Sequence, residues 1–196
     1  VGVDLQEIAF LIVKTWYQQT VEVQSEISSI QSVFANISVV TPDGTYRGSH
    51  GIPSGSWFTN VVGSLVHAYA QSTIRDLDPI KCQVMGDDGV IVLPKSITKL
   101  DVAGLYDKAG LSFNETKTFE SQDEAIYLQR YYSKDYERDG LLRGIYPVYR
   151  ALNRLIHMER WTNLVTLKGK DYFAIRAICI LENCKWHPMH REFVKW

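Results

Sequence analysis

The sequence is poor in cysteine and has no long apolar run, and both absences exclude classes of protein. Three cysteines in 196 residues are an odd number and too few for the disulfide scaffold of a small secreted domain. No apolar run approaches the roughly 18 residues of a membrane-spanning helix, so we expect no membrane partner. The chain also lacks an initial basic segment followed by an apolar run, which argues against a signal peptide.

Net charge is nearly absent as well, but the two parts of the chain differ in sign. The formal net charge is −1. Residues 1–128 carry 8 basic and 15 acidic side chains, whereas residues 129–196 carry 13 basic and 7 acidic ones. This asymmetry suggests a polyanionic partner for the basic part. The hydrophobic fraction of 45% is that of a folded globular chain and excludes a disordered tail.

The residue pattern predicts short strands interrupted by helices. Apolar residues at helical spacing, the last group ended by Gly110, predict three helices over residues 5–19, 57–71 and 97–109. β-rich runs and turn residues predict hairpins over 39–46 and 81–93 and one strand over 125–132. From Tyr146 onward the pattern is mainly helical. We therefore predict an α+β fold, with an antiparallel sheet flanked by helices over residues 1–128 and a helical part over 129–196.

The segment Gly86-Asp87-Asp88-Gly89, here called the acidic turn, carries the strongest chemical signal. Two adjacent carboxylates repel one another unless a cation lies between them. Mg²⁺ prefers oxygen ligands and commonly binds one or two carboxylates together with substrate phosphates. An ordinary Asp-Gly hairpin turn remains the alternative interpretation of this short motif.

A loop of small residues, Gly51 to Ser56, opens directly into the second predicted helix. Backbone N–H groups at the start of a helix favour anionic or polar ligands. Ser54 and Gly55 allow a ligand to approach closely, and the Thr59 hydroxyl lies about one turn into the helix. The alternative is a serine N-cap on a core helix.

Together the two segments resemble a known family. Ser54-Gly55-x-x-x-Thr59 followed by Gly86-Asp87-Asp88 resembles motifs B and C of viral RNA-directed RNA polymerases. The string Gly-Ile-Pro-Ser-Gly-Ser-Trp-Phe-Thr at 51–59 resembles the partitivirus-like group of double-stranded RNA viruses, with picobirnaviruses as relatives. Weaker matches follow in the expected order: Val3-Asp4 resembles the end of motif A, 110–117 motif D and 127–130 motif E.

The resemblance implies a right-hand polymerase that synthesises RNA on a template by nucleotidyl transfer, with Mg²⁺ or Mn²⁺ as cofactor. Residues 1–128 would be the palm, with a fingers-like insertion near 20–50, and residues 129–196 the start of a helical thumb. Asp87 would bind metal directly and Asp88 would support it or hold a second ion. Lys117 would protonate the leaving pyrophosphate. The remaining matching positions would contact the nucleotide or shape its loop: Asp4, Ser54, Gly55, Thr59 and Asn60.

The sequence departs from the family pattern at two places. The first motif A aspartate, the main partner of the motif C pair in metal binding, would lie upstream of Asp4 and outside these residues. Gly63 stands where many relatives have an asparagine that recognises the ribose, and Asn60 is near but not equivalent. We therefore expect residues 1–196 to be the central and C-terminal part of a larger enzyme and to be inactive alone.

The implied partners are an RNA template with its nascent strand, nucleoside triphosphates and a viral capsid protein. The implied location is the host cytoplasm and the interior of the virion. Arg130, Arg150 and Arg154 are candidate RNA contacts because arginines bind phosphates, and Arg150 and Arg154 are spaced to share a helix face. A solvated helix face is the alternative interpretation.

Competing hypotheses concern zinc and other palm-fold proteins. Cys179, Cys184, His187 and His190 have zinc-like spacing, but the apolar run around Cys179 favours a buried cysteine and surface histidines. A reverse transcriptase usually has an aromatic residue two positions before the aspartate pair, where this chain has Met85. A palm-fold RNA-binding domain without catalysis would bind RNA but show no metal-dependent synthesis.

Overall fold

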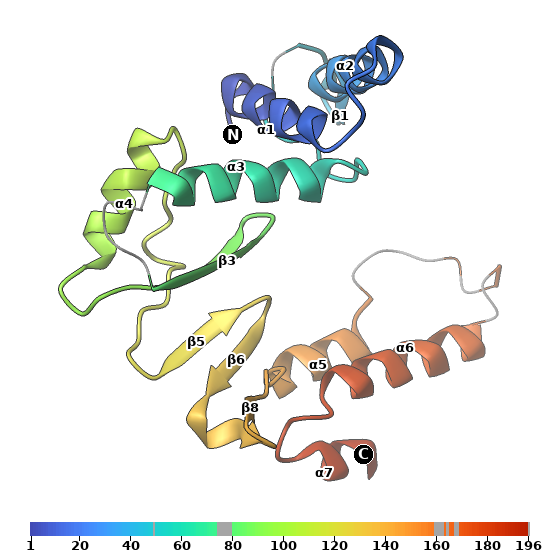
Figure 1. Cartoon of the computed structure of the whole chain (residues 1–196). Helices are drawn as coiled ribbons and strands as arrows, with labels where there is room; N and C mark the ends of the chain where they lie inside the picture. Colours follow the sequence, from blue (N-terminus) through green and yellow to red (C-terminus); the bar gives the residue numbers. More distant parts are fainter. Residues whose placement is uncertain (49, 74–79, 159–162, 164, 167–168, 196) are drawn as a thin grey trace. The chain divides into compact units, whose positions relative to one another are not determined.

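The structure is a computed structural model that describes residues 1–48, 50–73, 80–158, 163, 165–166 and 169–195 (Figure 1). The chain forms two compact units, Val1–Thr118 and Phe119–Trp196. The boundary between the acidic and the basic part of the chain, after Leu128, falls inside the turn of a hairpin of the second unit. The boundary between the compact units therefore lies ten residues before the boundary between the acidic and basic parts, because hairpin pairing keeps residues 124–133 together.

The first unit contains four helices and two hairpins among its described residues. In chain order its elements are α1 (Val3–Thr15), α2 (Val21–Ala35), β1 (Val39–Thr41), β2 (Gly44–Tyr46), α3 (Thr59–Thr73), β3 (Lys81–Met85), β4 (Asp88–Val92) and α4 (Lys99–Lys108). The helix expected from residue 57 begins at Thr59. Trp57 lies outside the helix and is 98% exposed, because residues 51–58 form the loop that leads into it.

The core of the first unit lies between α1, α2 and α3. Phe10 of α1 is 1% exposed, and its ring packs 5.5 Å from that of Phe34 in α2 and 5.7 Å from that of Phe58. Val62 and Val66 of α3, one helical turn apart, complete the cluster and are almost fully buried. Burying such side chains is worth about 1.5–3 kcal/mol each, which fixes α3 against α1.

Both ends of α4 are closed by local hydrogen bonds. Thr98 and Asp101 form a reciprocal capping box at the N-terminus. At the C-terminus Gly110 has a φ of 78°, and the Leu111 N–H donates to the Tyr106 carbonyl at 2.9 Å. This is a Schellman cap, which confirms the predicted role of Gly110. It holds α4 in place, so that Tyr106, Val102 and Ala70 form a second small core.

The second unit consists of two hairpins followed by helices. Its elements are β5 (Glu124–Tyr127), β6 (Arg130–Ser133), the 3-10 turn η2 (Lys134–Tyr136), β7 (Glu137–Arg138), β8 (Leu141–Leu142), α5 (Val148–Ile156), α6 (Gly169–Asn183) and α7 (His190–Lys195). The prediction of one strand over 125–132 is wrong. Leu128 and Gln129 have φ values of 49° and 63° and form a two-residue turn. Neither is glycine or asparagine, the usual signal for such a turn.

The expected α+β class with antiparallel strands is confirmed. The described strands form four separate two-stranded sheets rather than one wider sheet, with a single bridge between Tyr131 and Ile145 beyond them. Each sheet is a hairpin whose strands are adjacent in sequence, so each pairs locally. No helix in the described part of the chain is both long and apolar enough to cross a membrane.

Candidate functional site at the acidic turn

The acidic turn joins β3 to β4 through a two-residue loop. Met85 pairs with Asp88, so Gly86 and Asp87 are the two loop residues and Asp88 is the first residue of β4. Gly86 has a φ of 61° and Asp87 does not have a positive φ. A positive φ at the first loop position alone is typical of a type II′ turn, which favours glycine there. The turn therefore presents Asp87 at its tip and Asp88 directly beside it.

The two carboxylates of the acidic turn are exposed. The side chains of Asp87 and Asp88 form no hydrogen bond or ion pair with another described residue. Adjacent, unpaired carboxylates match the ligand chemistry of a hard divalent cation, which can complete its shell with water and phosphate oxygens. Within the described ranges no third histidine, cysteine, aspartate or glutamate joins them in a metal-binding group.

One face of α3 carries the acidic turn. Ser64 Oγ accepts a hydrogen bond from the Gly86 N–H at 2.7 Å, and His67 Nδ1 lies 3.2 Å from the Gly86 carbonyl oxygen. A Cβ at Gly63 would lie 3.5 Å from the Gly86 Cα, so helix and turn approach closely. Asn60, Gly63, Ser64 and His67 have the i, i+3, i+4, i+7 spacing of a single helix face.

Asn60 is the predicted nucleotide-contacting residue that the structure brings to the acidic turn. Its Nδ2 lies 3.6 Å from the position that a Cβ at Gly86 would occupy. The Ser64 hydroxyl lies 3.5 Å from Asn60 Oδ1. Asn60 is exposed, so its amide is free to contact a ligand beside the turn.

The loop before α3 is held by its own hydrogen bonds. The Thr59 hydroxyl donates to the Pro53 carbonyl across the loop, and the Phe58 N–H donates to Ser56 Oγ at 3.3 Å. Gly55 has a φ of 93°, which an ordinary side chain rarely permits, and Ser54 is exposed. Thr59 thus shapes the loop, since its hydroxyl proton is already used, while Ser54 and Gly55 form its exposed tip.

Asp4 and Lys117 occupy exposed positions on other elements of the first unit. Asp4 lies in the first turn of α1. Lys117 follows α4 in a local turn, where its N–H donates to Asn114 Oδ1 at 3.1 Å. No described hydrogen bond or ion pair links either side chain to the acidic turn. The structure therefore keeps both available to a ligand without bringing them into contact with Asp87.

His67 and Tyr106 belong to the site but were not singled out by the sequence. His67 Nε2 lies 2.7 Å from the Tyr106 hydroxyl oxygen, and the two rings meet edge to face with centroids 5.5 Å apart. Burial lowers the pKa of His67, opposed by the Gly86 carbonyl and the charges of Asp87 and Asp88. Burial raises the pKa of Tyr106 to about 12. The sequence signal that could have identified His67 is its spacing from Asn60, which places both residues on one face of the helix.

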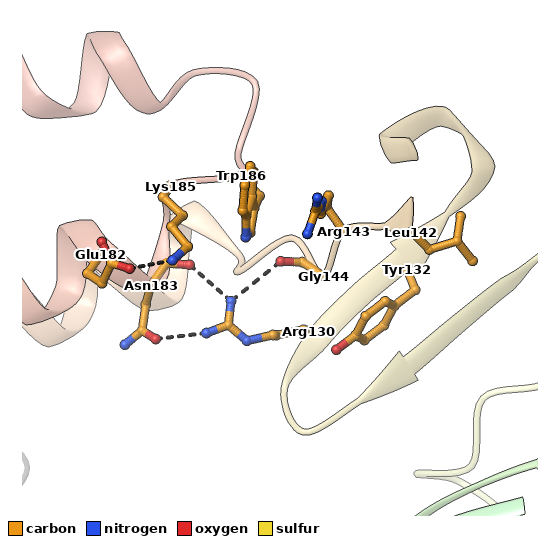
Figure 2. A pocket seen from close by; sticks show the side chains of 9 residues that line it. All are labelled: Arg130, Tyr132, Leu142, Arg143, Gly144, Glu182, Asn183, Lys185 and Trp186. Carbon is orange, nitrogen blue, oxygen red and sulfur yellow. Dashed lines mark hydrogen bonds and ion pairs between the residues drawn. The ribbon is translucent and has the colours of Figure 1, made fainter. Parts of the chain in front are cut away.

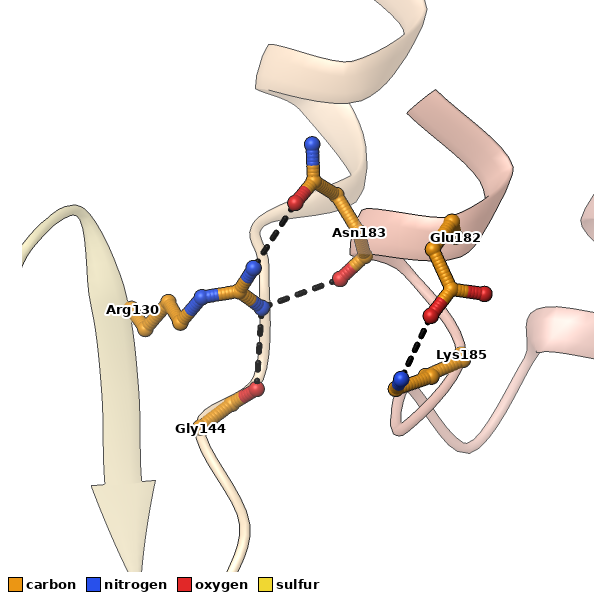
Figure 3. A network of polar contacts seen from close by, with 5 residues as sticks. All are labelled: Arg130, Gly144, Glu182, Asn183 and Lys185. Atoms are coloured by element: carbon orange, nitrogen blue, oxygen red, sulfur yellow. Dashed lines mark hydrogen bonds and ion pairs between the residues drawn. The ribbon is translucent and has the colours of Figure 1, made fainter. Parts of the chain in front are cut away.

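In the second unit Arg130 is engaged internally. Its Nη1 donates to the Asn183 carbonyl at 3.0 Å and to the Gly144 carbonyl at 3.4 Å, and its Nη2 donates to Asn183 Oδ1 at 2.8 Å (Figure 3). The guanidinium also lies over the Tyr146 ring. These contacts close the C-terminal end of α6, where a positive charge is favourable. These contacts make Arg130 part of the internal framework of the second unit, and its predicted contact with RNA stays a prediction.

A pocket of about 320 Å³ lies next to this network (Figure 2). On one side Arg143 stacks on Trp186, with its guanidinium carbon 4.5 Å from the ring centroid. On the other, Lys185 is paired with Glu182 in an exposed i,i+3 ion pair. The basic side chains at the pocket are thus largely matched by aromatic or acidic neighbours.

Arg150 and Arg154 lie one turn apart on α5, as predicted. Arg150 is exposed and Arg154 is half-buried. The neighbouring face of α5 packs on α6 through Ala151 and Leu155. The Arg154 backbone carbonyl accepts a hydrogen bond from Arg176 Nε at 2.8 Å, whereas the guanidinium groups of Arg150 and Arg154 have no described partner. These two arginines form the free basic face of α5.

The candidate zinc residues are not brought together in the described chain. Cys184 is buried and burial raises its thiol pKa. The prediction that Cys179 is buried is wrong, because it is exposed. α6 buries the face that carries Ile180 and Cys184, and Cys179 lies off that face.

Comparison with known proteins gives consistent matches. The family model for viral RNA-dependent RNA polymerase matches residues 4–196. A potential RNA-dependent RNA polymerase of human picobirnavirus is 38% identical over 152 residues, which cover 75% of this chain and 28% of that protein. The genome polyprotein of human rhinovirus 14 is 26% identical over 179 residues, or 85% of this chain and 8% of the polyprotein.

Solved structures agree with these matches. The crystal structure of the RNA-dependent RNA polymerase of a human picobirnavirus matches with a TM-score of 0.84 and 30% identity, covering 97% of this chain and 37% of that one. An insertion-loop deletion mutant of a human picobirnavirus polymerase matches with a TM-score of 0.85 and 30% identity, over 97% and 38%. This confirms the right-hand polymerase fold. The chain spans less than half the length of these relatives, and it belongs to the viral RNA-dependent RNA polymerase family.

Proposed function

We propose that this chain supplies the acidic turn at which a viral polymerase carries out template-directed RNA synthesis. The observation that carries the proposal is the exposed pair Asp87 and Asp88, held by α3 and unpaired with any described cation. In the reaction the primer 3′-hydroxyl attacks the α-phosphate of the incoming nucleotide, and pyrophosphate leaves. The family match favours this reaction over reverse transcription.

The donor set of the acidic turn fits Mg²⁺ or Mn²⁺. Asp87 would be the direct ligand, and Asp88 would support it or hold a second ion. When bound, the ion supplies positive charge opposite the phosphate oxygens of the nucleotide.

Other residues would contact the nucleotide around this turn. Asn60 lies beside Gly86 and would hydrogen-bond the sugar or base of the nucleotide. The loop tip at Ser54 and Gly55, shaped by Thr59, would approach the nucleotide and template strand. Asp4 would accept a hydrogen bond from the ribose 2′-hydroxyl, and Lys117 would give a proton to the leaving pyrophosphate.

The two compact units would correspond to parts of the polymerase hand. Val1–Thr118 would be palm, with α2 and the β1–β2 hairpin as a fingers-like insertion, and Phe119–Trp196 would be the start of the thumb. The partners would be template and nascent RNA, nucleoside triphosphates and a viral capsid protein. Synthesis would take place in the host cytoplasm and inside the virion.

Replacing Asp87 by Asn tests the proposal in the full-length protein that contains these residues. We expect RNA synthesis to fall by at least about 100-fold, because a metal ligand of the reaction is lost, and Mn²⁺ binding measured without nucleotide to weaken. Asp43→Asn, at the turn of the β1–β2 hairpin, is the matched control and should leave both unchanged. Near-normal synthesis by Asp87→Asn would refute the proposal.

The second candidate is the palm-fold RNA-binding protein without catalysis that the sequence left open. The unaltered full-length protein distinguishes the two. RNA binding with no synthesis in Mg²⁺ or Mn²⁺ would favour the binding protein.

A further inference from the structure

We propose that His67 is a positioning residue that holds the backbone of the acidic turn in the orientation RNA synthesis requires. The inference rests on the proposed function, since it assigns His67 a task only if Asp87 and Asp88 serve the reaction. It extends that function to a side chain on α3 and, through it, to Tyr106 on α4.

Both polar backbone groups of Gly86 are held by side chains of α3. Its N–H donates to Ser64 Oγ at 2.7 Å, and its carbonyl oxygen lies 3.2 Å from His67 Nδ1. That carbonyl belongs to the peptide unit that joins Gly86 to Asp87. A planar peptide unit cannot turn on one side alone, so fixing this carbonyl restricts the direction in which Asp87 leaves the turn.

The hydrogen-bond partners of the His67 ring determine which of its nitrogens carries the proton. A carbonyl oxygen only accepts hydrogen bonds, so Nδ1 of His67 carries a proton and donates it to Gly86. In a neutral ring Nε2 is then an acceptor, and the Tyr106 hydroxyl, 2.7 Å away, donates to it. Burial favours the neutral ring and the protonated hydroxyl. The Gly86 carbonyl thereby selects the tautomer, and the Tyr106 hydroxyl supports it by donating to Nε2.

The residues around the His67 ring leave just enough space for it. A Cβ at Gly89, in β4, would lie 2.6 Å from His67 Cε1 and 2.9 Å from Nε2. Glycine at position 89 therefore leaves room for the His67 ring. On the other side Tyr106 packs against Phe113, with ring centroids 5.7 Å apart. A continuous set of contacts thus leads from the core beneath α4 to the peptide unit before Asp87.

The test compares two His67 variants and one Tyr106 variant in the full-length polymerase. His67→Phe keeps a ring but removes the donor, and we expect kcat to fall about tenfold with the KM for nucleotide within about twofold of the original. His67→Asn keeps an amide donor at the position of Nδ1 and should recover most of kcat. Tyr106→Phe should lower kcat by about fivefold, the effect of one lost neutral hydrogen bond.

A second readout does not depend on activity. The ¹⁵N chemical shifts of His67 in the unaltered protein should show a protonated Nδ1 and an unprotonated Nε2, and Tyr106→Phe should shift the Nε2 signal. If His67→Phe does not fold, these shifts and Tyr106→Phe decide the question. An unchanged kcat in His67→Phe, an equal loss in His67→Phe and His67→Asn, or a protonated Nε2 would each overturn the inference.

The outcome is separable from that of the proposed function. If Asp87→Asn is inactive while His67→Phe retains its kcat, only the positioning role fails. If Asp87→Asn retains synthesis, the proposed function fails whatever the His67 variants show.

Discussion

Arg130 and Asn183 are joined by two hydrogen bonds, from Nη1 to the Asn183 backbone carbonyl at 3.0 Å and from Nη2 to its side-chain oxygen at 2.8 Å. The pair links β6 to the last residue of α6. Because two donors of one planar group meet two acceptors of one residue, the contact fixes both distance and direction. Arg130 therefore belongs to the framework of the second unit.

Replacing Arg130 by Met should lower the free energy of unfolding of the second unit by about 2 kcal/mol, since hydrogen bonds from a charged group are lost. Urea unfolding measures the change. Arg150→Met, on the exposed face of α5, should change it by less than about 0.5 kcal/mol. Weaker RNA binding by Arg130→Met with unchanged stability would instead favour a direct RNA contact.

Replacing Gly89 by Ala should destabilise the first unit by about 1–3 kcal/mol, because the new methyl group would force the buried His67 ring to move. The control is Gly104→Ala in the interior of α4, where a Cβ meets nothing within 4 Å. That change should stabilise by about 0.5–1 kcal/mol. Thermal unfolding of both variants checks that Gly89→Ala lowers stability and Gly104→Ala raises it. Equal changes in stability would contradict the close packing of Gly89 on His67.

The pKa of His67 predicts how stability depends on pH without divalent cations. Burial holds that pKa below its ordinary value of 6.5, so between the two values the unfolded chain binds more protons. The free energy of unfolding should then fall as pH drops below about 6.5 and level off below the folded-state pKa. His67→Asn should reduce this slope. His187, whose pKa burial also lowers, contributes with the same sign and leaves a remaining slope.

Replacing Arg150 and Arg154 together by Gln should weaken RNA binding and reduce its salt dependence, by about one unit of log–log slope per arginine. Fluorescence anisotropy with a labelled RNA at several salt concentrations gives both quantities. Arg191 and Lys195 lie four residues apart on α7, and replacing both by Gln gives the same change of charge. If both pairs behave alike, the effect is one of net charge, and α5 has no special role.

The elements with strong local signals could be predicted from the sequence. Gly110 marked the end of α4 because a Schellman cap needs a positive φ, and the acidic turn was placed correctly between two β-rich runs. The β5–β6 hairpin could not be predicted, since Leu128 and Gln129 adopt positive φ without glycine or asparagine. Their conformation follows from strand pairing, which a local pattern does not reveal.

The candidate site was predictable only in part for a similar reason. Asp87 and Asp88 carry their chemistry in their own side chains, so the motif was visible. His67 and Tyr106 are 39 residues apart, and each alone resembles an ordinary core residue. At Arg130 the charge suggests an RNA contact, but the local pattern does not reveal the hydrogen bonds to Asn183 at the end of α6.

The close approach of Gly63 to Gly86 also restricts how this site can diverge among relatives. A methyl group at 63 would just touch the Gly86 Cα at 3.5 Å, so a longer side chain there must turn away from Gly86 or displace the turn. Residues larger than alanine should therefore be accepted at 63 only where their side chains can leave the contact with Gly86 intact, so this position limits how the site can change.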